Sequence, residues 1–268
     1  MIPNRSELLE RFPSLVALRR DAARLHPRPG ISNLGASSFG APALLRSGEP
    51  WPTCGAVHGS GDNLDRAGIP ESMVLGLRLL RSEVPGLPFR GEEDLCQIFW
   101  CPLFHGRFWE PRVEVMWQFS SHRRDLRPVP YVRSAHAVAD YVPSPCSISP
   151  EMIPEYPSDD ELPEELRSEV GSWADERGIW YSDLAAAPGS KVGGYACWRN
   201  GDQTPTCAAG HRMVLLVTVA SYEDDPESYA MWGREPGGNG LNFDDAGDLH
   251  IFICTICDNR PIVSLIAP

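Results

Sequence analysis

The sequence predicts an α+β fold that is mainly β and internally duplicated. Three observations point to it. Six apolar runs have the length and composition of strands, motifs of the first half return in the same order in the second, and each half carries a matching Cys/His set. With 268 residues the chain is long enough for one large domain or two of moderate size. We expect the two copies to form one compact pseudo-twofold domain.

Residues 1–31 are expected to form an N-terminal helical segment. From Ser6, a potential N-cap, to Leu25, apolar residues recur at helical spacing. Pro13 is expected to divide this run into a short turn and a longer helix. Residues 26–51 are rich in Pro, Gly and Ser, which predicts a loop with short extended pieces.

Each copy contains three predicted strands. In the first copy, residues 32–122, they span 73–80, 95–100 and 113–119; in the second, residues 190–268, they span 213–219, 249–254 and 261–266. Residues 123–189 are expected to be a linker with a helix. Its proline-punctuated part, up to Pro157, is predicted to wrap over the surface, and an amphipathic helix capped by Asp160 or Glu161 follows it.

Four motifs keep their order in both copies, which chance similarity rarely achieves. The pairs are Ser32-Asn33-Leu34-Gly35-Ala36 with Ser190-Lys191-Val192-Gly193-Gly194, Pro52-Thr53-Cys54-x-x-x-His58 with Pro205-Thr206-Cys207-x-x-x-His211, Met73-Val74-Leu75 with Met213-Val214-Leu215, and residues 94–101 with 248–254.

The Cys and His residues of this repeat predict up to two structural zinc ions. The first copy offers Cys54, His58, Cys101 and His105, and the second offers Cys207, His211, Cys254 and Cys257. Each set consists of two pairs whose members are three or four residues apart, and the second pair follows a predicted strand. Tetrahedral zinc takes four such nitrogen and sulfur ligands, and a filled shell leaves no open position for catalysis.

Other interpretations of these residues are open. The cysteines could be buried free thiols beside surface histidines, and Cys254 with Cys257 could be a redox dithiol, although no helix is predicted after them. Cys96, Cys146 and Cys197 have no partners in the scheme and are interpreted as core thiols. Most of the eight tryptophans are also expected in the core.

The net charge and the absence of certain motifs argue against several classes of function. A net charge of -12 argues against binding to nucleic acid or an anionic membrane, and it suits a basic protein partner. There is no apolar run of membrane-spanning length and no apolar signal-peptide core at the N-terminus, so we expect a cytoplasmic protein. Phosphate-binding, dinucleotide-binding and zinc-protease motifs are missing.

An enzyme is the alternative function. A hydrolase or transferase could use carboxylates and histidines in a cleft between the copies, with His136, Asp140, Asp244 and Asp245 as candidates. The acidic clusters at residues 159–161, 224–225 and 244–245 could supply paired carboxylates, but such loops are usually only solvated.

The chain resembles the YwqG-like family, a bacterial domain of unknown function, in its actinobacterial-type branch. The resemblance rests on residues 187–194, Pro205-Thr206-Cys207, residues 213–216 and residues 247–254, with linker residues such as Cys146 and Glu155-Tyr156-Pro157. It implies a mainly β α+β fold with a duplication. Relatives show C-x-x-C-G after the proline, whereas Gly210 and His211 stand in the last two places here, so His211 must supply the ligand.

A more distant similarity is to eukaryotic programmed-cell-death-2-type proteins, which look like ribosomal-protein chaperones. Neither resemblance implies an enzymatic activity. The leading hypothesis is therefore a non-enzymatic zinc-binding protein that recognises a partner protein, as an immunity protein or a chaperone for a basic protein.

Overall fold

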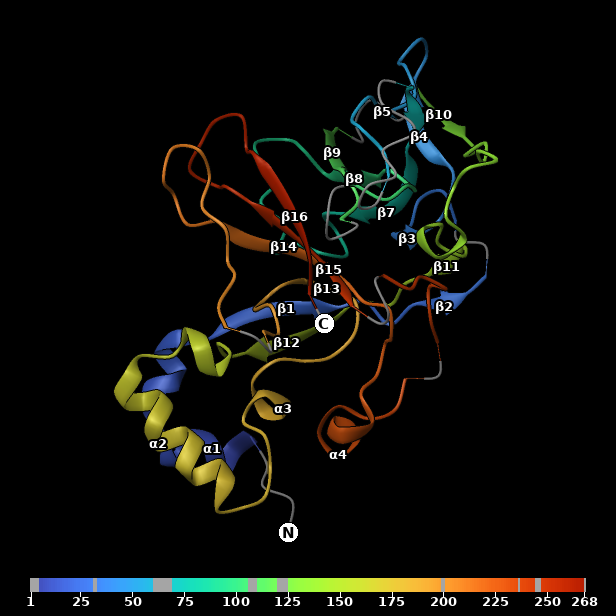
Figure 1. Cartoon of the computed structure of the whole chain (residues 1–268). Coiled ribbons are helices and arrows are strands. Elements are labelled where there is room, and N and C mark those ends of the chain that lie inside the picture. The colour runs from blue at the N-terminus through green and yellow to red at the C-terminus, as the bar shows by residue number, and fades with distance from the viewer. Residues whose placement is uncertain are drawn as a thin grey trace.

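The computed structural model describes residues 5–30, 33–59, 69–105, 110–119, 125–198, 201–235, 237–243 and 247–267. Two six-stranded antiparallel sheets dominate it, so the predicted mainly β fold is confirmed (Figure 1). No helix within the described ranges is long and apolar enough to cross a membrane.

The first sheet belongs mostly to the first copy. Its strands, in spatial order, are β2 (Arg28–Pro29), β11 (Cys146–Ser147), β3 (Ser38–Phe39), β7 (Val74–Leu80), β8 (Leu95–Trp100) and β9 (Val113–Gln118). Two short ribbons accompany this sheet: β4 (Ala43–Arg46) pairs with β10 (Leu126–Val129), and β5 (Thr53–Cys54) pairs with β6 (Glu71–Ser72).

The second sheet has the spatial order β12 (Glu151–Glu155), β1 (Arg20–Arg24), β13 (Lys191–Gly193), β14 (Val214–Val219), β15 (Asp248–Ile253) and β16 (Ile262–Ala267). All six strands predicted from periodicity are therefore present, as β7, β8, β9, β14, β15 and β16, with ends that differ by a residue or two.

The segments outside the copies contain strands that the sequence does not predict. The expected N-terminal helix is only α1 (Arg5–Arg11) with a 3-10 turn (Pro13–Leu18), and the rest of the run is strand β1. The spacing of apolar residues does not distinguish a helix from a strand in this segment. Ala22 and Ala23 are neighbours in β1 and are both buried, and in a strand that is covered on both faces apolar residues need not alternate with polar ones. The linker does not merely wrap over the surface, because it supplies β10, β11 and β12.

These extra strands interlock the two sheets. The chain passes from β1 in the second sheet to β2 in the first, and it later passes from β11 in the first sheet to β12 in the second. β1 lies between β12 and β13, and β11 lies between β2 and β3. Each sheet therefore contains strands from segments outside its own copy.

The two halves repeat the same local contacts, in a different alignment from that predicted. Ser37 N–H donates to Glu83 Oε2 at 2.8 Å, and Ser190 N–H donates to Glu223 Oε2 at 2.8 Å. The Ser37 hydroxyl accepts a hydrogen bond from the Leu80 N–H, and the Ser190 hydroxyl accepts one from the Ala220 N–H. Leu80 and Ala220 each lie seven residues beyond the methionine of the Met-Val-Leu motif. Ser190 is thus matched by Ser37, not by Ser32, which lies outside the described residues. That the halves arose by duplication stays a prediction.

The main core lies between the two sheets. Alternate residues of both sheets fill it, including Leu77, Ile98 and Trp100 from the first and Val217 and Ile251 from the second. Burying this apolar surface provides the dominant stabilisation of the fold. The opposite faces of the sheets carry smaller clusters, and Phe99 with Cys101 and Phe252 with Cys254 belong to them.

A helical cluster lies beside β1 and β12, at the lower left of Figure 1. It contains α1, a 3-10 turn η4 (Asp159–Glu161), α2 (Glu164–Asp175) and α3 (Ser182–Ala185). The predicted linker helix is α2, but Pro163 precedes it as N-cap instead of Asp160 or Glu161. Three short elements complete the fold: η3 (Ala139–Tyr141), η5 (Pro226–Ser228) and α4 (Tyr229–Trp232).

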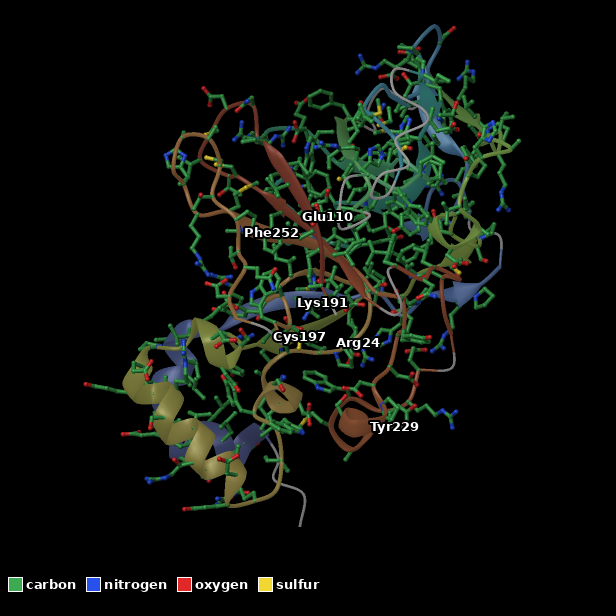
Figure 2. All side chains as sticks on the ribbon, viewed as in Figure 1. Arg24, Glu110, Lys191, Cys197, Tyr229 and Phe252 are labelled. Atoms are coloured by element: carbon green, nitrogen blue, oxygen red, sulfur yellow. The ribbon has the colours of Figure 1, made fainter. Side chains whose placement is uncertain are left out.

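A buried ion pair ties the linker to the second sheet. Lys191, the chain's single lysine, places Nζ 2.8 Å from Glu155 Oε1 and 3.1 Å from the Ala187 carbonyl oxygen (Figure 2). Glu155 also accepts backbone N–H groups of Ala187 and Tyr195. A buried charge needs such full pairing, because an unpaired one would be costly.

Candidate metal centres

The structure gathers the eight predicted ligands into two groups of four. In each group the nitrogen and sulfur atoms all lie within 4.8 Å of one another. The first group is Cys54, His58, Cys101 and His105, and the second is Cys207, His211, Cys254 and Cys257. All eight cysteines are free thiols. Both groups could therefore hold a metal ion.

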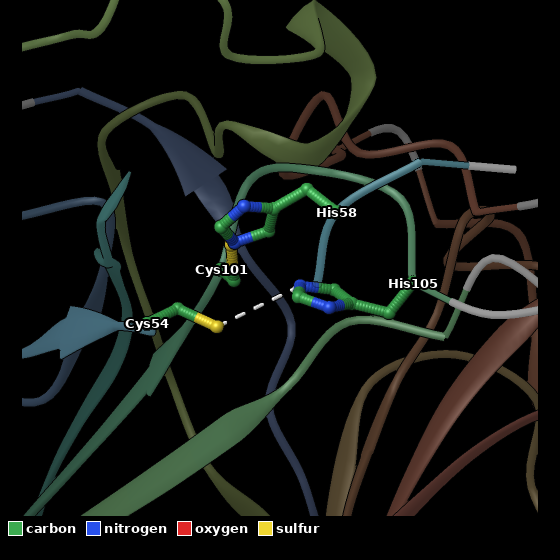
Figure 3. Close-up of side chains that lie close together, drawn as sticks. All are labelled: Cys54, His58, Cys101 and His105. Carbon is green, nitrogen blue, oxygen red and sulfur yellow. Dashed lines mark hydrogen bonds between the residues drawn. The ribbon is translucent and has the colours of Figure 1, made fainter. Parts of the chain in front are cut away.

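The first group lies beside the first sheet, where four loop and strand ends meet (Figure 3). Cys54 ends β5, and Cys101 follows β8 directly, so the two cysteines are held by strand pairing. The Cys54 Sγ atom lies 3.8 Å from His105 Nε2, and the two imidazole centroids are 4.8 Å apart. All four residues are buried.

The histidines of this group are prepared to act as ligands. His105 Nδ1 lies 3.1 Å from the Val57 carbonyl oxygen, and because a carbonyl only accepts, Nδ1 must carry the proton and Nε2 is left as the ligand atom. The Nε2 atom of His58 is buried and has no hydrogen-bond partner among the described residues. Buried polar atoms are almost always satisfied, so this atom fits a metal ligand.

The second group surrounds one imidazole nitrogen. His211 Nδ1 lies 3.4 Å from Cys257 Sγ, 3.6 Å from Cys207 Sγ and 3.8 Å from Cys254 Sγ. The Cys207 and Cys257 sulfurs are 3.9 Å apart, far beyond a disulfide bond.

Local backbone geometry positions these ligands. Residues 207–211 form a tight turn in which Cys207 N–H donates to the His211 carbonyl, and Gly210 adopts φ +80°, which favours glycine. After β15, a turn brings the Cys257 N–H to 3.4 Å from Cys254 Sγ. No helix follows that turn, since the chain continues into β16, so the helix typical of a redox C-x-x-C motif is missing.

The sulfurs of each group compete for negative charge. The Cys101 thiol hydrogen-bonds to Cys54 and lowers the pKa of Cys54, and the same contact, together with burial, raises the pKa of Cys101. In the second group the Cys257 N–H lowers the pKa of Cys254, while the hydrogen bond with Cys254 raises the pKa of Cys257. A cation bound between the sulfurs would remove this competition, because it stabilises every thiolate around it.

The first half of the chain supports the second group. Arg90 donates to the carbonyl oxygens of Cys257 and Asp258 at 3.0 and 2.8 Å, and Arg260 forms a two-bond ion pair with Glu93 at 2.6 and 2.7 Å. Sequence reasoning missed these residues because each arginine is far in sequence from its partner.

Two of the four candidates for an enzyme, His136 and Asp140, are among the described residues. His136 and Asp140 are exposed, and Asp244 and Asp245 lie outside the described residues. Cys96 and Cys146 are buried as predicted, but Cys197 is only half-buried, so its interpretation as a core thiol is wrong. Most of the described tryptophans are buried or partly buried, as expected, and the exception is Trp180, which is 65% exposed.

Two of the acidic clusters do meet. Asp159 and Asp160 line a cavity of about 800 Å³ together with Asp224 and Asp225. From the sequence, such clusters could supply paired carboxylates but are usually only solvated loops, and only the tertiary fold brings residues 159–160 and 224–225 to one cavity.

No protein-family model matches this chain, and no curated protein has a significantly similar sequence.

Proposed function

We propose that this chain is a non-enzymatic zinc-binding protein that recognises a basic partner protein. Two closed zinc sites would fix the loops on the outer faces of the sheets. The partner class follows from charge, because the net charge is -12 and a basic surface is its electrostatic complement. A chaperone or an immunity protein for a basic protein fits this description, and the resemblance to the YwqG-like family stays part of the proposal.

The spacing of the donor atoms is the observation that carries the zinc assignment. Bonds of about 2.0–2.3 Å to zinc give tetrahedral edges of about 3.3–3.8 Å between ligand atoms. The separations around His211 Nδ1 are 3.4, 3.6 and 3.8 Å, and Cys54 to His105 is 3.8 Å. Sulfur and imidazole donors suit zinc, whereas calcium and magnesium prefer oxygen.

The closed shells favour a structural role. Each group supplies four protein ligands, which fills a tetrahedral site and leaves no position for a substrate or an activated water. Zinc would then act by holding segments together, and the protein's own surface would perform the recognition.

Affinity capture tests the partner class. The zinc-loaded full chain is immobilised and exposed to extract of the producing organism at about 20 mM salt, then washed at about 500 mM salt. We expect proteins of basic isoelectric point among those released, and each purified candidate should bind again with an affinity that falls as salt rises. If every released protein is neutral or acidic, or if rebinding ignores salt, the basic-partner proposal is wrong.

A further inference from the structure

We propose that the second Cys/His group responds to oxidation by hydrogen peroxide. The peroxide links Cys207 to Cys257 through a disulfide bond, and the group then loses its zinc ion, while the first group resists the same treatment. The inference rests on the proposed function for the presence of zinc. It adds a chemical response to a site that would otherwise only hold loops in place.

The two groups differ in how easily a small oxidant reaches their sulfur atoms. All four residues of the first group are buried, with Cys54 4% and Cys101 0% exposed. In the second group Cys257 is half-buried, and it lies in a turn whose neighbouring residues Ile256 and Asp258 are exposed. Cys257 is therefore the most exposed cysteine of the two groups.

The two ligand sets also differ in charge. Three thiolates and a neutral imidazole around a zinc ion leave one net negative charge in the second group, whereas two thiolates and two imidazoles leave none in the first. The additional negative charge makes the sulfur atoms of the second group more nucleophilic. Because peroxide oxidises cysteine through attack by a thiolate, exposure and charge both favour reaction at the second group.

Within the second group, Cys257 and Cys207 are the pair placed to react. Their sulfur atoms are 3.9 Å apart and must approach each other by about 2 Å to form a disulfide bond. The third cysteine, Cys254, is 0% exposed, and its sulfur accepts a hydrogen bond from Cys257 N–H at 3.4 Å. Burial and this hydrogen bond make the Cys254 sulfur less reactive than the other two.

The backbone around the group is held by contacts that do not depend on a metal ion. Cys254 N–H donates to the Pro261 carbonyl at 3.0 Å, and Arg90, from the first half, donates to the Cys257 carbonyl at 3.0 Å. The turn that carries Cys207 is closed by its own backbone hydrogen bonds. These contacts keep the two reacting sulfurs close together while the coordination is lost.

The reaction balances with one molecule of hydrogen peroxide. The Cys257 thiolate attacks a peroxide oxygen, the O–O bond breaks, and hydroxide leaves, which converts Cys257 to a sulfenic acid. The Cys207 thiolate then attacks the Cys257 sulfur, the S–O bond breaks, and a second hydroxide leaves. The two sulfurs lose two electrons and the peroxide gains them. Cys254 and His211 remain as ligands, which are too few for a structural zinc site.

Peroxide treatment of the zinc-loaded full chain tests the proposal. A chromogenic chelator of moderate affinity reports the zinc that is released, and elemental analysis reports the zinc that stays bound. We expect bound zinc to fall from about two to about one per chain, and to return to about two after reduction with dithiothreitol in the presence of added zinc. Release of both zinc ions together, or of neither, would overturn the proposal.

Peptide mapping identifies the disulfide. Trypsin places Cys207 in a peptide of residues 200–212, where it is the single cysteine, and places Cys254 and Cys257 in a peptide of residues 235–268. After peroxide treatment and blocking of the remaining thiols, we expect these two peptides to be joined, with Cys254 blocked. A disulfide within residues 235–268, between Cys254 and Cys257, would contradict the assigned pair.

Two variants sharpen the test. Cys207→His keeps four nitrogen and sulfur ligands but leaves two thiolates, so it should bind about two zinc ions and release zinc at least about fivefold more slowly, with no joined peptides. Cys197→Ala is the control, because Cys197 is also half-buried but belongs to neither group, and it should leave the release unchanged. Loss of the release in Cys197→Ala would contradict the proposal. The peptide map of the unmodified chain decides the pairing even if Cys207→His binds zinc poorly.

Failure of this inference and failure of the proposed function are seen at different steps. If the untreated protein contains about two zinc ions and keeps both in peroxide, the inference is wrong and the proposed zinc sites stand. If the untreated protein contains almost no zinc, the zinc part of the proposed function fails before any peroxide is added.

Discussion

Two of the three histidines in the metal groups present different ring nitrogens to cysteine sulfur. His105 directs Nε2 towards Cys54, whereas His211 directs Nδ1 towards three sulfurs. The Nδ1 atom is closer to the backbone, so a ligand of this kind suits the tight turn in which Cys207 N–H bonds to the His211 carbonyl. Gly210 supplies the positive φ that this turn requires.

Removing one ligand should remove one metal ion. In Cys257→Ala, the second group keeps three ligands, and we expect bound zinc to fall from about two to about one per chain, with a lower melting temperature. Cys96→Ala is the matched control, because Cys96 is equally a cysteine, fully buried in the main core, and belongs to neither group. Metal analysis of both variants gives the comparison; loss of zinc from Cys96→Ala would contradict the assignment of ligands.

At the scale of the elements, matching strands of the two halves fill the core in complementary ways. In β7, Gly76 lies at an irregularity in the pairing with β8, and an added Cβ there would stand 1.7 Å from the Trp100 ring. In β14 the irregularity falls at the corresponding Leu216, and Ile253 takes the place of the tryptophan. The first half thus has a small and a large residue, Gly76 and Trp100, where the second half has two residues of medium size, and this arrangement conserves core volume.

Gly76→Ala should therefore destabilise the protein by about 2 kcal/mol or more. The Trp100 ring cannot easily move aside, because its Nε1 donates to the Tyr141 carbonyl at 2.7 Å and the residue is fully buried. Gly86→Ala is the control, since a Cβ at this exposed glycine would meet nothing within 4 Å. Denaturant unfolding gives both free energies; similar values for the two variants would show that the ring can yield.

Periodicity predicted the six long strands because each has several consecutive residues packed into a core. It could not predict β1, β11 or β12, which are short and owe their strand conformation to partners from distant parts of the chain. Cysteine and histidine spacing likewise predicted both candidate metal groups, because the ligands come in local pairs. The acidic cavity has no such local signal, since its lining comes from five separate segments.

At the scale of the whole molecule, the exchange of strands joins the two halves. The N-terminal strand β1 lies inside the second sheet, between β12 and β13, and the linker strand β11 lies inside the first, between β2 and β3. The Glu93–Arg260 ion pair and the Arg90 contacts add links between the first half and the second metal group. Neither sheet can be completed by its own copy alone.

Unfolding should therefore be a single cooperative event in spite of the repeated architecture. We expect near-ultraviolet circular dichroism, tryptophan fluorescence and zinc release to give the same midpoint in a denaturant titration. Separate transitions, or a stable fold in a fragment of residues 146–268 that lacks β1, would contradict the interlocked arrangement.

The central claim is that two zinc ions are bound by the two Cys/His groups, and elemental analysis of the purified native protein tests it most directly. The account predicts about two zinc atoms per chain, together with a lower melting temperature after chelation. A zinc content near zero, with a melting temperature that a chelator leaves unchanged, would mean that the eight residues are unligated thiols and imidazoles and that packing alone holds the sheets and loops.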